Sequence, residues 1–132
     1  MSNPINILLI EDDADDIELL EEALKGNNVS YRLTSIKEGD KVMSHLGTTI
    51  GVPDIIVLDF NLPKLHGREI LSLIKSSEKF GTVPLVVLTT SASREDISFA
   101  KHMGANHYIT KPTSISDFNR AVATIVETAG VS

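Results

Sequence analysis

The chain has 132 residues, 42% of them hydrophobic, and its 18 acidic and 12 basic residues give a formal net charge of −6. This length and apolar content predict a single globular domain and exclude an intrinsically disordered chain. Because the chain contains no cysteine, disulfide bonds, thiolate zinc sites and cysteine nucleophiles are excluded.

Five short apolar runs predict β-strands, and most of them are continuously apolar rather than alternating. Continuous runs are typical of strands covered on both faces, as in a parallel sheet. The second and fifth runs are weaker and are expected nearer the edges of the sheet. The runs cover residues 5–10, 31–36, 55–58, 83–88 and 107–109.

Apolar residues at helical spacing separate these strands and follow the last one. Asp13 is the predicted N-cap of the first helix, and Ser114 and Asp117 have capping-box-like spacing at the start of the fifth. Gly104 is a predicted C-terminal stop for the fourth helix. The alternation of strands and helices predicts an α/β fold with one parallel sheet and helices on both faces. The apolar stripes are Ile17, Leu20 and Leu24; Val42, Met43 and Leu46; Ile70, Leu71 and Ile74; Ile97, Ala100 and Met103; and Phe118, Ala121, Val122, Ile125 and Val126.

The acidic residues are concentrated in one segment. Residues 11–22 hold eight of them and neither Lys nor Arg, whereas the rest of the chain holds 10 acids and 12 bases. Asp15, Glu18 and Glu22 follow helical spacing and are predicted to form a solvated helix face, and Asp16 is assigned to the helix N-terminus. The net charge is therefore a local feature of the chain and says little about partners.

No segment of the sequence predicts membrane insertion or secretion. No apolar run approaches the roughly 18 residues of a membrane span, and the start of the chain lacks the basic region of a signal peptide. We therefore expect a soluble, cytoplasmic protein that does not bind membranes. With no basic stripe and no helix-turn-helix after the fifth helix, direct nucleic-acid binding is not expected either.

Polar residues follow four of the predicted strands. Glu11 and Asp12 end the first strand, Asp59 the third and Thr89 the fourth, and Lys111 follows the fifth. In an open α/β sheet the site lies outside the carboxyl ends of the strands, so these groups converge if their strands are neighbours.

Three converging carboxylates repel one another unless a cation joins them, and Mg²⁺ suits oxygen ligands. A hydroxyl and an ammonium opposite such a metal are donors for an anionic oxygen cluster such as a phosphoryl group. A carboxylate can act as the nucleophile in forming an aspartyl phosphate. Asp59 is the predicted acceptor, because it lies on a central strand between the acid pair and the donors.

These motifs resemble the response-regulator receiver domain of two-component signalling over nearly the whole chain. The resemblance implies a doubly wound (βα)5, flavodoxin-like fold with a five-stranded parallel sheet in the strand order 2-1-3-4-5. It also implies that residues 1–132 form a single receiver domain with no output domain. Within the family the chain most resembles stand-alone regulators partnered with phytochrome-type histidine kinases. The matching segments are ILLIEDD ending at Asp13, DFNLPKLHG from Asp59 to Gly67, VLTTS ending at Ser91, and YITKP from Tyr108 to Pro112.

The resemblance assigns the chemistry to five residues. It implies that Asp59 accepts a phosphoryl group from a kinase phosphohistidine. Glu11 and Asp12 would hold Mg²⁺ together with Asp59 and the backbone carbonyl of Asn61, and Lys111 would pair with the phosphoryl group. The protein would then be a phosphoacceptor that contributes to its own phosphorylation and dephosphorylation, and not an enzyme in the usual sense.

The resemblance also implies a switch and two sites that tune it. Thr89 would hydrogen-bond the phosphoryl oxygen, and Tyr108 would move with Thr89 and change the face made by the fourth helix, fifth strand and fifth helix. That face would carry protein–protein signalling and a possible homodimer. Asn61 and Ser91 stand where the family tunes phosphate lifetime. Pro112 is expected to follow a cis peptide bond that aims Lys111 into the pocket.

Alternative functions on the same fold are also considered. A flavodoxin-like scaffold or binding protein that does not use phosphate stays open, although no Gly-rich phosphate loop follows the first strand, which counts against a flavin site. A phosphatase would need a second acid close after the nucleophile, and Asn61 occupies that position. His66 stands where the family often has Asp, and it is expected not to touch the chemistry.

Overall fold

The structure is a computed structural model that describes residues 4–49, 51–62 and 65–130. Pro63 and Lys64, which belong to one of the motifs quoted above, lie outside the described residues. Within the described part of the chain, no helix is long and apolar enough to cross a membrane.

In the described residues, five parallel strands form one sheet, and their spatial order is β2-β1-β3-β4-β5. The predicted fold class and strand order are therefore confirmed. The fourth strand begins two residues later than predicted, because Pro84 has no N–H for the ladder and only its carbonyl oxygen bonds to Ile56. The strands are β1 (Ile5–Ile10), β2 (Tyr31–Ile36), β3 (Ile55–Leu58), β4 (Leu85–Thr89) and β5 (His107–Thr110).

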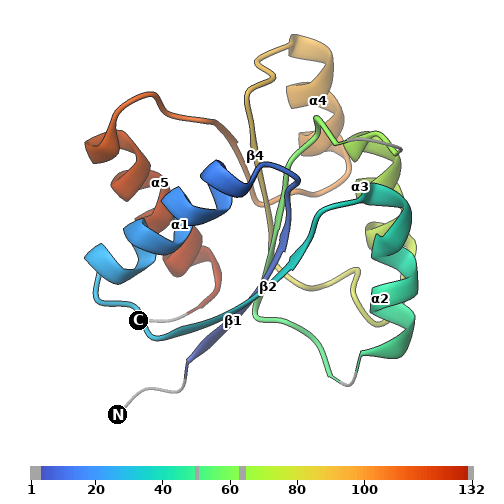
Figure 1. The fold of residues 1–132 in the computed structure, drawn as a ribbon. Helices are drawn as coiled ribbons and strands as arrows, with labels where there is room; N and C mark the ends of the chain where they lie inside the picture. Colours follow the sequence, from blue (N-terminus) through green and yellow to red (C-terminus); the bar gives the residue numbers. More distant parts are fainter. Residues whose placement is uncertain (1–3, 50, 63–64, 131–132) are drawn as a thin grey trace.

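Five helices cover the two faces of the sheet, with α1 and α5 on one face and α2, α3 and α4 on the other (Figure 1). Asp13 caps α1 by accepting the backbone N–H of Asp15 at 2.9 Å, and Ser114 caps α5 by accepting the N–H of Asp117 at 3.2 Å. Both predicted caps are thus confirmed. The helices are α1 (Ala14–Gly26), α2 (Val42–Thr48) after a short 3₁₀ turn (Gly39–Lys41), α3 (Gly67–Ser76), α4 (Arg94–His102) and α5 (Ile115–Thr128).

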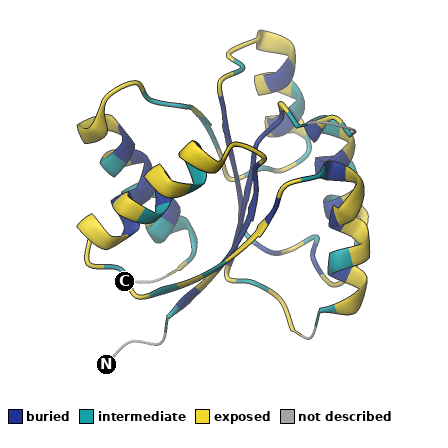
Figure 2. Ribbon diagram, viewed as in Figure 1, coloured by how far each residue is buried: buried dark blue, intermediate teal, exposed yellow. Residues whose placement is uncertain are grey.

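The core lies in two layers, one on each side of the sheet (Figure 2). All residues of β3 are fully buried, whereas β2 is half-buried or exposed at every position except Ile36, as expected for an edge strand. The outer strand β5 is also partly exposed, so the expectation for the two weaker runs is confirmed.

Two predictions of the buried helix faces are wrong. Met43, in the predicted apolar stripe of the second helix, is 38% exposed. Ile97, in the predicted stripe of the fourth helix, is also 38% exposed, and its neighbour Asp96 is buried instead. The helix α4 therefore faces the sheet with Asp96 and Ala100 rather than with Ile97. Ala100 lies in the core, and Asp96 pairs with Arg68 of α3. An ion pair therefore overrides the hydrophobic periodicity in the first turn of α4.

The strand register brings the ends of β1 and β3 to the same level. Ile10 pairs with Leu58, and the N–H of Asp59 donates to the carbonyl of Ile10 at 3.0 Å. Where β4 and β5 end, the N–H of Lys111 donates to the carbonyl of Thr89 at 2.7 Å. Residues at the end of β4 or directly after β1, β3 and β5 thus meet at one edge of the sheet.

Candidate functional site

Three carboxylates meet at this edge of the sheet. Glu11, Asp12 and Asp59 each offer a carboxylate oxygen, and these oxygens all lie within 4.8 Å of one another. Glu11 and Asp59 are buried, with 3% and 4% of their surface exposed, while Asp12 is exposed to solvent. The set fits a divalent cation, because three carboxylate oxygens that converge in this way are the ligands that a hard cation takes, and the exposed Asp12 leaves a route for the ion to enter.

Glu11 is held in place by the backbone that follows it. Its carboxylate accepts the N–H groups of Asp12 at 3.1 Å and of Asp13 at 3.3 Å. Burial, together with the neighbouring Asp59, raises the pKa of Glu11 to about 7, and this effect outweighs the lowering by the hydrogen bond from Lys111. Before a metal binds, Glu11 therefore holds its proton close to neutral pH.

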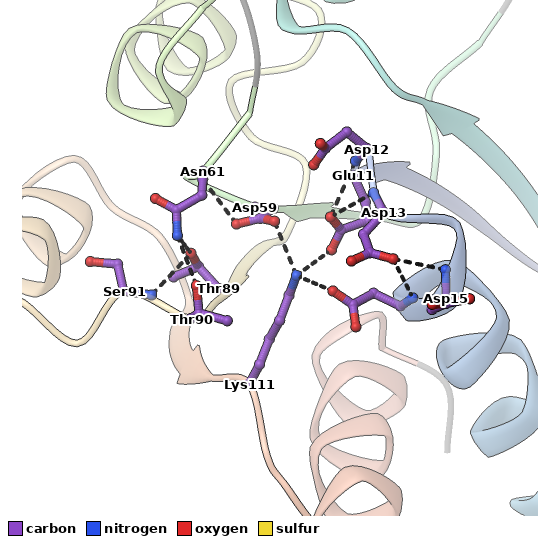
Figure 3. Close-up of polar contacts among 11 residues, drawn as sticks. Glu11, Asp12, Asp13, Asp15, Asp59, Asn61, Thr89, Thr90, Ser91 and Lys111 are labelled. Atoms are coloured by element: carbon purple, nitrogen blue, oxygen red, sulfur yellow. Dashed lines mark hydrogen bonds and ion pairs between the residues drawn. The ribbon is translucent and has the colours of Figure 1, made fainter.

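Lys111 is the cation of the site and contacts three carboxylates. Its ammonium lies 2.6 Å from Glu11, 2.7 Å from Asp16 and 3.0 Å from Asp59, and its side chain is only 9% exposed. Burial lowers its pKa, but hydrogen bonds to Asp16 and Glu11 outweigh this and the net pKa is raised. Figure 3 shows the ammonium reaching between Asp59 and Glu11. Lys111 is thus a permanent positive charge beside the Asp59 carboxylate.

Asp16 is a site residue that the sequence interpretation missed. It was assigned to the helix N-terminus, yet it pairs with Lys111 in the structure. A signal was present in the sequence, because Asp16 lies four residues before Leu20 and eight before Leu24, which are 1% and 0% exposed. The exposed residues Asp15, Glu18 and Glu22 do form the predicted solvated face.

The predicted cis peptide bond before Pro112 is wrong. The described residues contain no cis peptide bond, so Lys111 and Pro112 are joined by a trans bond. Trans is favoured for most X–Pro bonds. Lys111 reaches all three carboxylates from this trans backbone, so the cis bond is not needed to aim its side chain.

Neutral donors and hydroxyls surround Asp59 on its other side. The N–H of Asn61 donates to Asp59 at 3.0 Å, and the Asn61 side-chain amide donates to Thr90 at 2.9 Å and to Thr89 at 3.4 Å. Burial raises the pKa of Asp59, but hydrogen bonds from the Asn61 N–H, Glu11 and Thr89 outweigh it and the net pKa is lowered. Asp59 is therefore ionised at neutral pH, as a nucleophile must be. Thr90 was not predicted to take part.

Ser91 and Tyr108 lie one step further from Asp59. The Ser91 hydroxyl points away from Asp59 (Figure 3) and donates to Asp96 at 2.6 Å, while the Tyr108 hydroxyl donates to the Ser91 carbonyl at 2.7 Å. The Tyr108 ring packs edge-on against Phe60, with centroids 5.9 Å apart. Ser91 therefore links the site to α4, and its predicted role in phosphate lifetime stays a prediction.

His66 stands outside this cluster. Its Nδ1 accepts the backbone N–H of Arg68 at 3.0 Å and so caps α3. No contact links His66 to the carboxylates or to Lys111 among the hydrogen bonds and ion pairs of the described residues, which agrees with the expectation from the sequence.

Comparison with known proteins agrees with this geometry. The family model of the response regulator receiver domain matches residues 7–123. The probable methanogenesis regulatory protein FilR2 of Methanothrix harundinacea is 36% identical over 95% of this chain and 83% of its own length. Response regulator Rcp1 of Synechocystis is 35% identical over 92% of this chain and 86% of its own length.

Two solved structures are close matches. The phosphorylated cyanobacterial phytochrome response regulator RcpA is 36% identical, superposes with a TM-score of 0.86, and the match covers 95% of this chain and 93% of RcpA. The Mn²⁺-bound form of Rcp1 is 34% identical with a TM-score of 0.83, covering 94% and 93% of the two chains. The predicted resemblance to phytochrome-associated regulators is confirmed, and the chain belongs to the response regulator receiver domain family.

Proposed function

We propose that Asp59 accepts a phosphoryl group in a Mg²⁺-dependent reaction, and that the protein is a phosphorylation-dependent switch. The observation that carries this proposal is the position of the two Asp59 carboxylate oxygens. Oδ2 accepts from the Lys111 ammonium at 3.0 Å, and Oδ1 accepts from the Asn61 N–H at 3.0 Å. A buried, ionised carboxylate fixed in this way between a cation and hydrogen-bond donors is suited to attack phosphorus.

The surrounding residues fit the charges that this reaction develops. An Asp59 oxygen would form a new bond to phosphorus while the P–N bond of a phosphohistidine donor breaks and its electron pair returns to the imidazole. Lys111 and the Thr89 hydroxyl are within reach of Asp59 to stabilise the phosphoryl oxygens. Such transfer is mostly positioning and charge stabilisation, so this chain would supply much of the chemistry itself.

We propose Mg²⁺ as the metal. Glu11, Asp12 and Asp59, with the backbone carbonyl of Asn61, would hold it, and the ion would offset the negative charge of the phosphoryl oxygens. The hard oxygen donors support this choice, and the Mn²⁺-bound form of the relative Rcp1 supports a divalent ion in a homologous chain. Ca²⁺ is less well suited, because it takes six to eight oxygen ligands, whereas Mg²⁺ keeps several of its waters and is typically bound through only one or two carboxylates.

Partners and setting complete the proposal. The donor would be a histidine kinase of the phytochrome type, which the description of RcpA as a phytochrome response regulator supports. The chain would act in the cytoplasm, where the kinase obtains ATP, as a single receiver domain over residues 1–132. Its output would be protein–protein contact through the face of α4, β5 and α5, including a homodimer, without direct contact to nucleic acid or membrane.

The test is incubation with acetyl phosphate and Mg²⁺, with the product read by intact-protein mass spectrometry. We expect wild type to gain one phosphoryl group and Asp59→Asn to gain none. Asp54→Asn is the matched control, because Asp54 is an exposed acid directly before β3 whereas Asp59 directly follows that strand. An unmodified wild type, or equal labelling of Asp59→Asn, would contradict the proposal and favour the phosphate-independent scaffold.

A further inference from the structure

A buried carboxylate outside the phosphoryl-accepting site needs an explanation. Asp96, in the first turn of α4, is 7% exposed. Its Oδ1 accepts from Arg68 Nε at 2.6 Å and its Oδ2 from the Ser91 hydroxyl at 2.6 Å. Burial raises the pKa of Asp96, but the bonds to Ser91 and Arg68 outweigh it and the net pKa is lowered. The protein therefore keeps a charge in a largely buried position where an apolar residue would fit the helix periodicity.

Arg68 ties two helices together through this carboxylate. It comes from α3, and besides pairing with Asp96 it places its guanidinium 5.6 Å from the centroid of the Phe99 ring. Asp96 and Phe99 are about one turn apart on α4, so Arg68 contacts α4 at two positions, through an ion pair and a cation–π contact. The start of α4 is thus fixed to α3.

Ser91 is the point at which this link meets the site. Its N–H donates to the Thr89 hydroxyl at 3.3 Å, its carbonyl accepts from the Tyr108 hydroxyl at 2.7 Å, and its own hydroxyl donates to Asp96. Thr89 and Tyr108, the two side chains proposed to respond to phosphorylation, are therefore both bonded to the backbone of Ser91. Ser91 in turn is held from the other side by Asp96.

We infer that Asp96 is a positioning residue for the phosphoryl-accepting site. With Arg68 it fixes Ser91, and Ser91 keeps the Thr89 hydroxyl beside Asp59 and Tyr108 packed against Phe60. This inference rests on the proposed function of Asp59. Asp96 touches none of the reacting atoms and acts only by favouring one of two arrangements of the loop between β4 and α4.

Coupling of this kind is reciprocal. A phosphoryl group on Asp59 would pull the Thr89 hydroxyl towards it and so away from the Ser91 N–H that now donates to it. A resulting shift of Ser91 would reach α4 through the hydrogen bond from Ser91 to Asp96. The ion pair between Asp96 and Arg68 then limits how far the start of α4 moves with Ser91.

The experiment compares Asp96→Asn with Asp117→Asn. Both aspartates lie in the first turn of a helix, both donate their N–H to an N-cap serine, and both pair with an arginine, but Asp117 and its partner Arg120 are largely exposed on α5. The chain has two tyrosines, so 3-fluorotyrosine labelling gives two ¹⁹F resonances. Tyr31 bonds to Glu21 and serves as the internal reference.

We expect Asp96→Asn to move the Tyr108 resonance towards a solvent-exposed ring in the unphosphorylated protein. The ratio of inward to outward rings should fall about tenfold, the factor expected for losing one hydrogen bond to a charged group. Labelling by acetyl phosphate at saturating Mg²⁺ should slow by about the same factor. Asp117→Asn should leave both readouts at the wild-type value.

A Tyr108 resonance and labelling rate in Asp96→Asn equal to those of Asp117→Asn would overturn the inference. If circular dichroism shows that Asp96→Asn does not fold, Ser91→Ala decides the question, since it removes only the hydroxyl that reaches Asp96 and keeps both backbone bonds. Failure of wild type to become phosphorylated would overturn the proposed function, while the Tyr108 resonance, read without a phosphodonor, would still report whether Asp96 positions the loop.

Discussion

The two sides of Asp59 are built from different interactions. On one side, Glu11, Asp16 and Lys111 form a cluster of charges, which we call the charged half. On the other side, the neutral half consists of Asn61, Thr89, Thr90 and Ser91, linked by neutral hydrogen bonds of 2.9–3.4 Å. Asp59 belongs to both, through Oδ2 and Oδ1 respectively.

The difference separates two tasks. Buried charges respond to ions, protons and anions, so the charged half is where a metal and a phosphoryl group would be sensed. Neutral hydrogen bonds respond mainly to geometry, so the neutral half is suited to pass a change of position towards α4. Variants of each half should therefore differ in their dependence on Mg²⁺ and pH.

Removing the cation of the charged half should have the largest effect. Lys111→Ala leaves Glu11, Asp16 and Asp59 without their common partner, and breaking a buried ion pair costs about 3–5 kcal/mol. We expect a loss of this size in the free energy of unfolding by urea without divalent metal, partly restored by Mg²⁺. Lys101→Ala, at an exposed lysine of α4, is the control. A loss that Mg²⁺ does not reduce would show that the charged half is not a cation site.

The pH dependence of stability should also come from the charged half. Glu11 titrates at about 7 in the folded protein against an ordinary value of 4.5, so the folded state binds more protons between these values. The free energy of unfolding without metal should therefore fall as pH rises from 4.5 to 7, by at most about 3 kcal/mol.

Asp59 and Lys111, the other shifted groups in contact with Glu11, act outside this window. The lowered pKa of Asp59 affects stability only below pH 3.8, and the raised pKa of Lys111 only above pH 10.5. Between pH 4.5 and 7, the free energy of unfolding measured by chemical denaturation should change less with pH in Glu11→Gln than in wild type. It should also change less in wild type with Mg²⁺, because a bound ion displaces the Glu11 proton. An unchanged slope in Glu11→Gln would contradict the assignment.

The backbone between the two halves offers a test that disturbs both. Phe60 is fully buried between Asp59 and Asn61, and a Cβ at Gly67 would lie 2.3 Å from the Phe60 Cα. Gly67→Ala should lower the free energy of unfolding by about 2 kcal/mol, because this overlap is with backbone that cannot move aside cheaply. Gly47→Ala has no atom within 4 Å of the new Cβ and lies in α2, so it should stabilise the protein by about 0.5 kcal/mol. Equal free energies of unfolding for Gly67→Ala and Gly47→Ala would show that the backbone around Phe60 moves aside without cost.

The neutral half should give the smallest effect. Thr89 is fully buried, and its hydroxyl accepts from the Asn61 amide and the Ser91 N–H. Thr89→Val should lower the free energy of unfolding by about 1 kcal/mol, equally with and without Mg²⁺ and across pH 4.5–7. Thr34→Val, at an exposed position of β2, should change it little. A loss of stability in Thr89→Val that depends on Mg²⁺ would show that the charged and neutral halves do not act separately.

Much of the fold could be predicted because its signals are local. The continuous apolar runs, the Asp13 and Ser114 caps and the alternation of strands with helices depend on residues within a few positions of one another. The residues that directly follow strands, Glu11 and Asp59, could be selected by position, since parallel strands bring their carboxyl ends to one edge.

Tertiary structure decided what local signals cannot express. Asp15 and Asp16 are neighbours with the same chemistry, yet only Asp16 meets Lys111, which lies 95 residues away in the chain. The raised pKa of Glu11 and the burial of Asp96 likewise depend on partners from distant elements. The sequence by itself determined which residues stand at the edge of the sheet. Packing determined their charge states and contacts, because burial and long-range ion pairs exist only once the chain has folded.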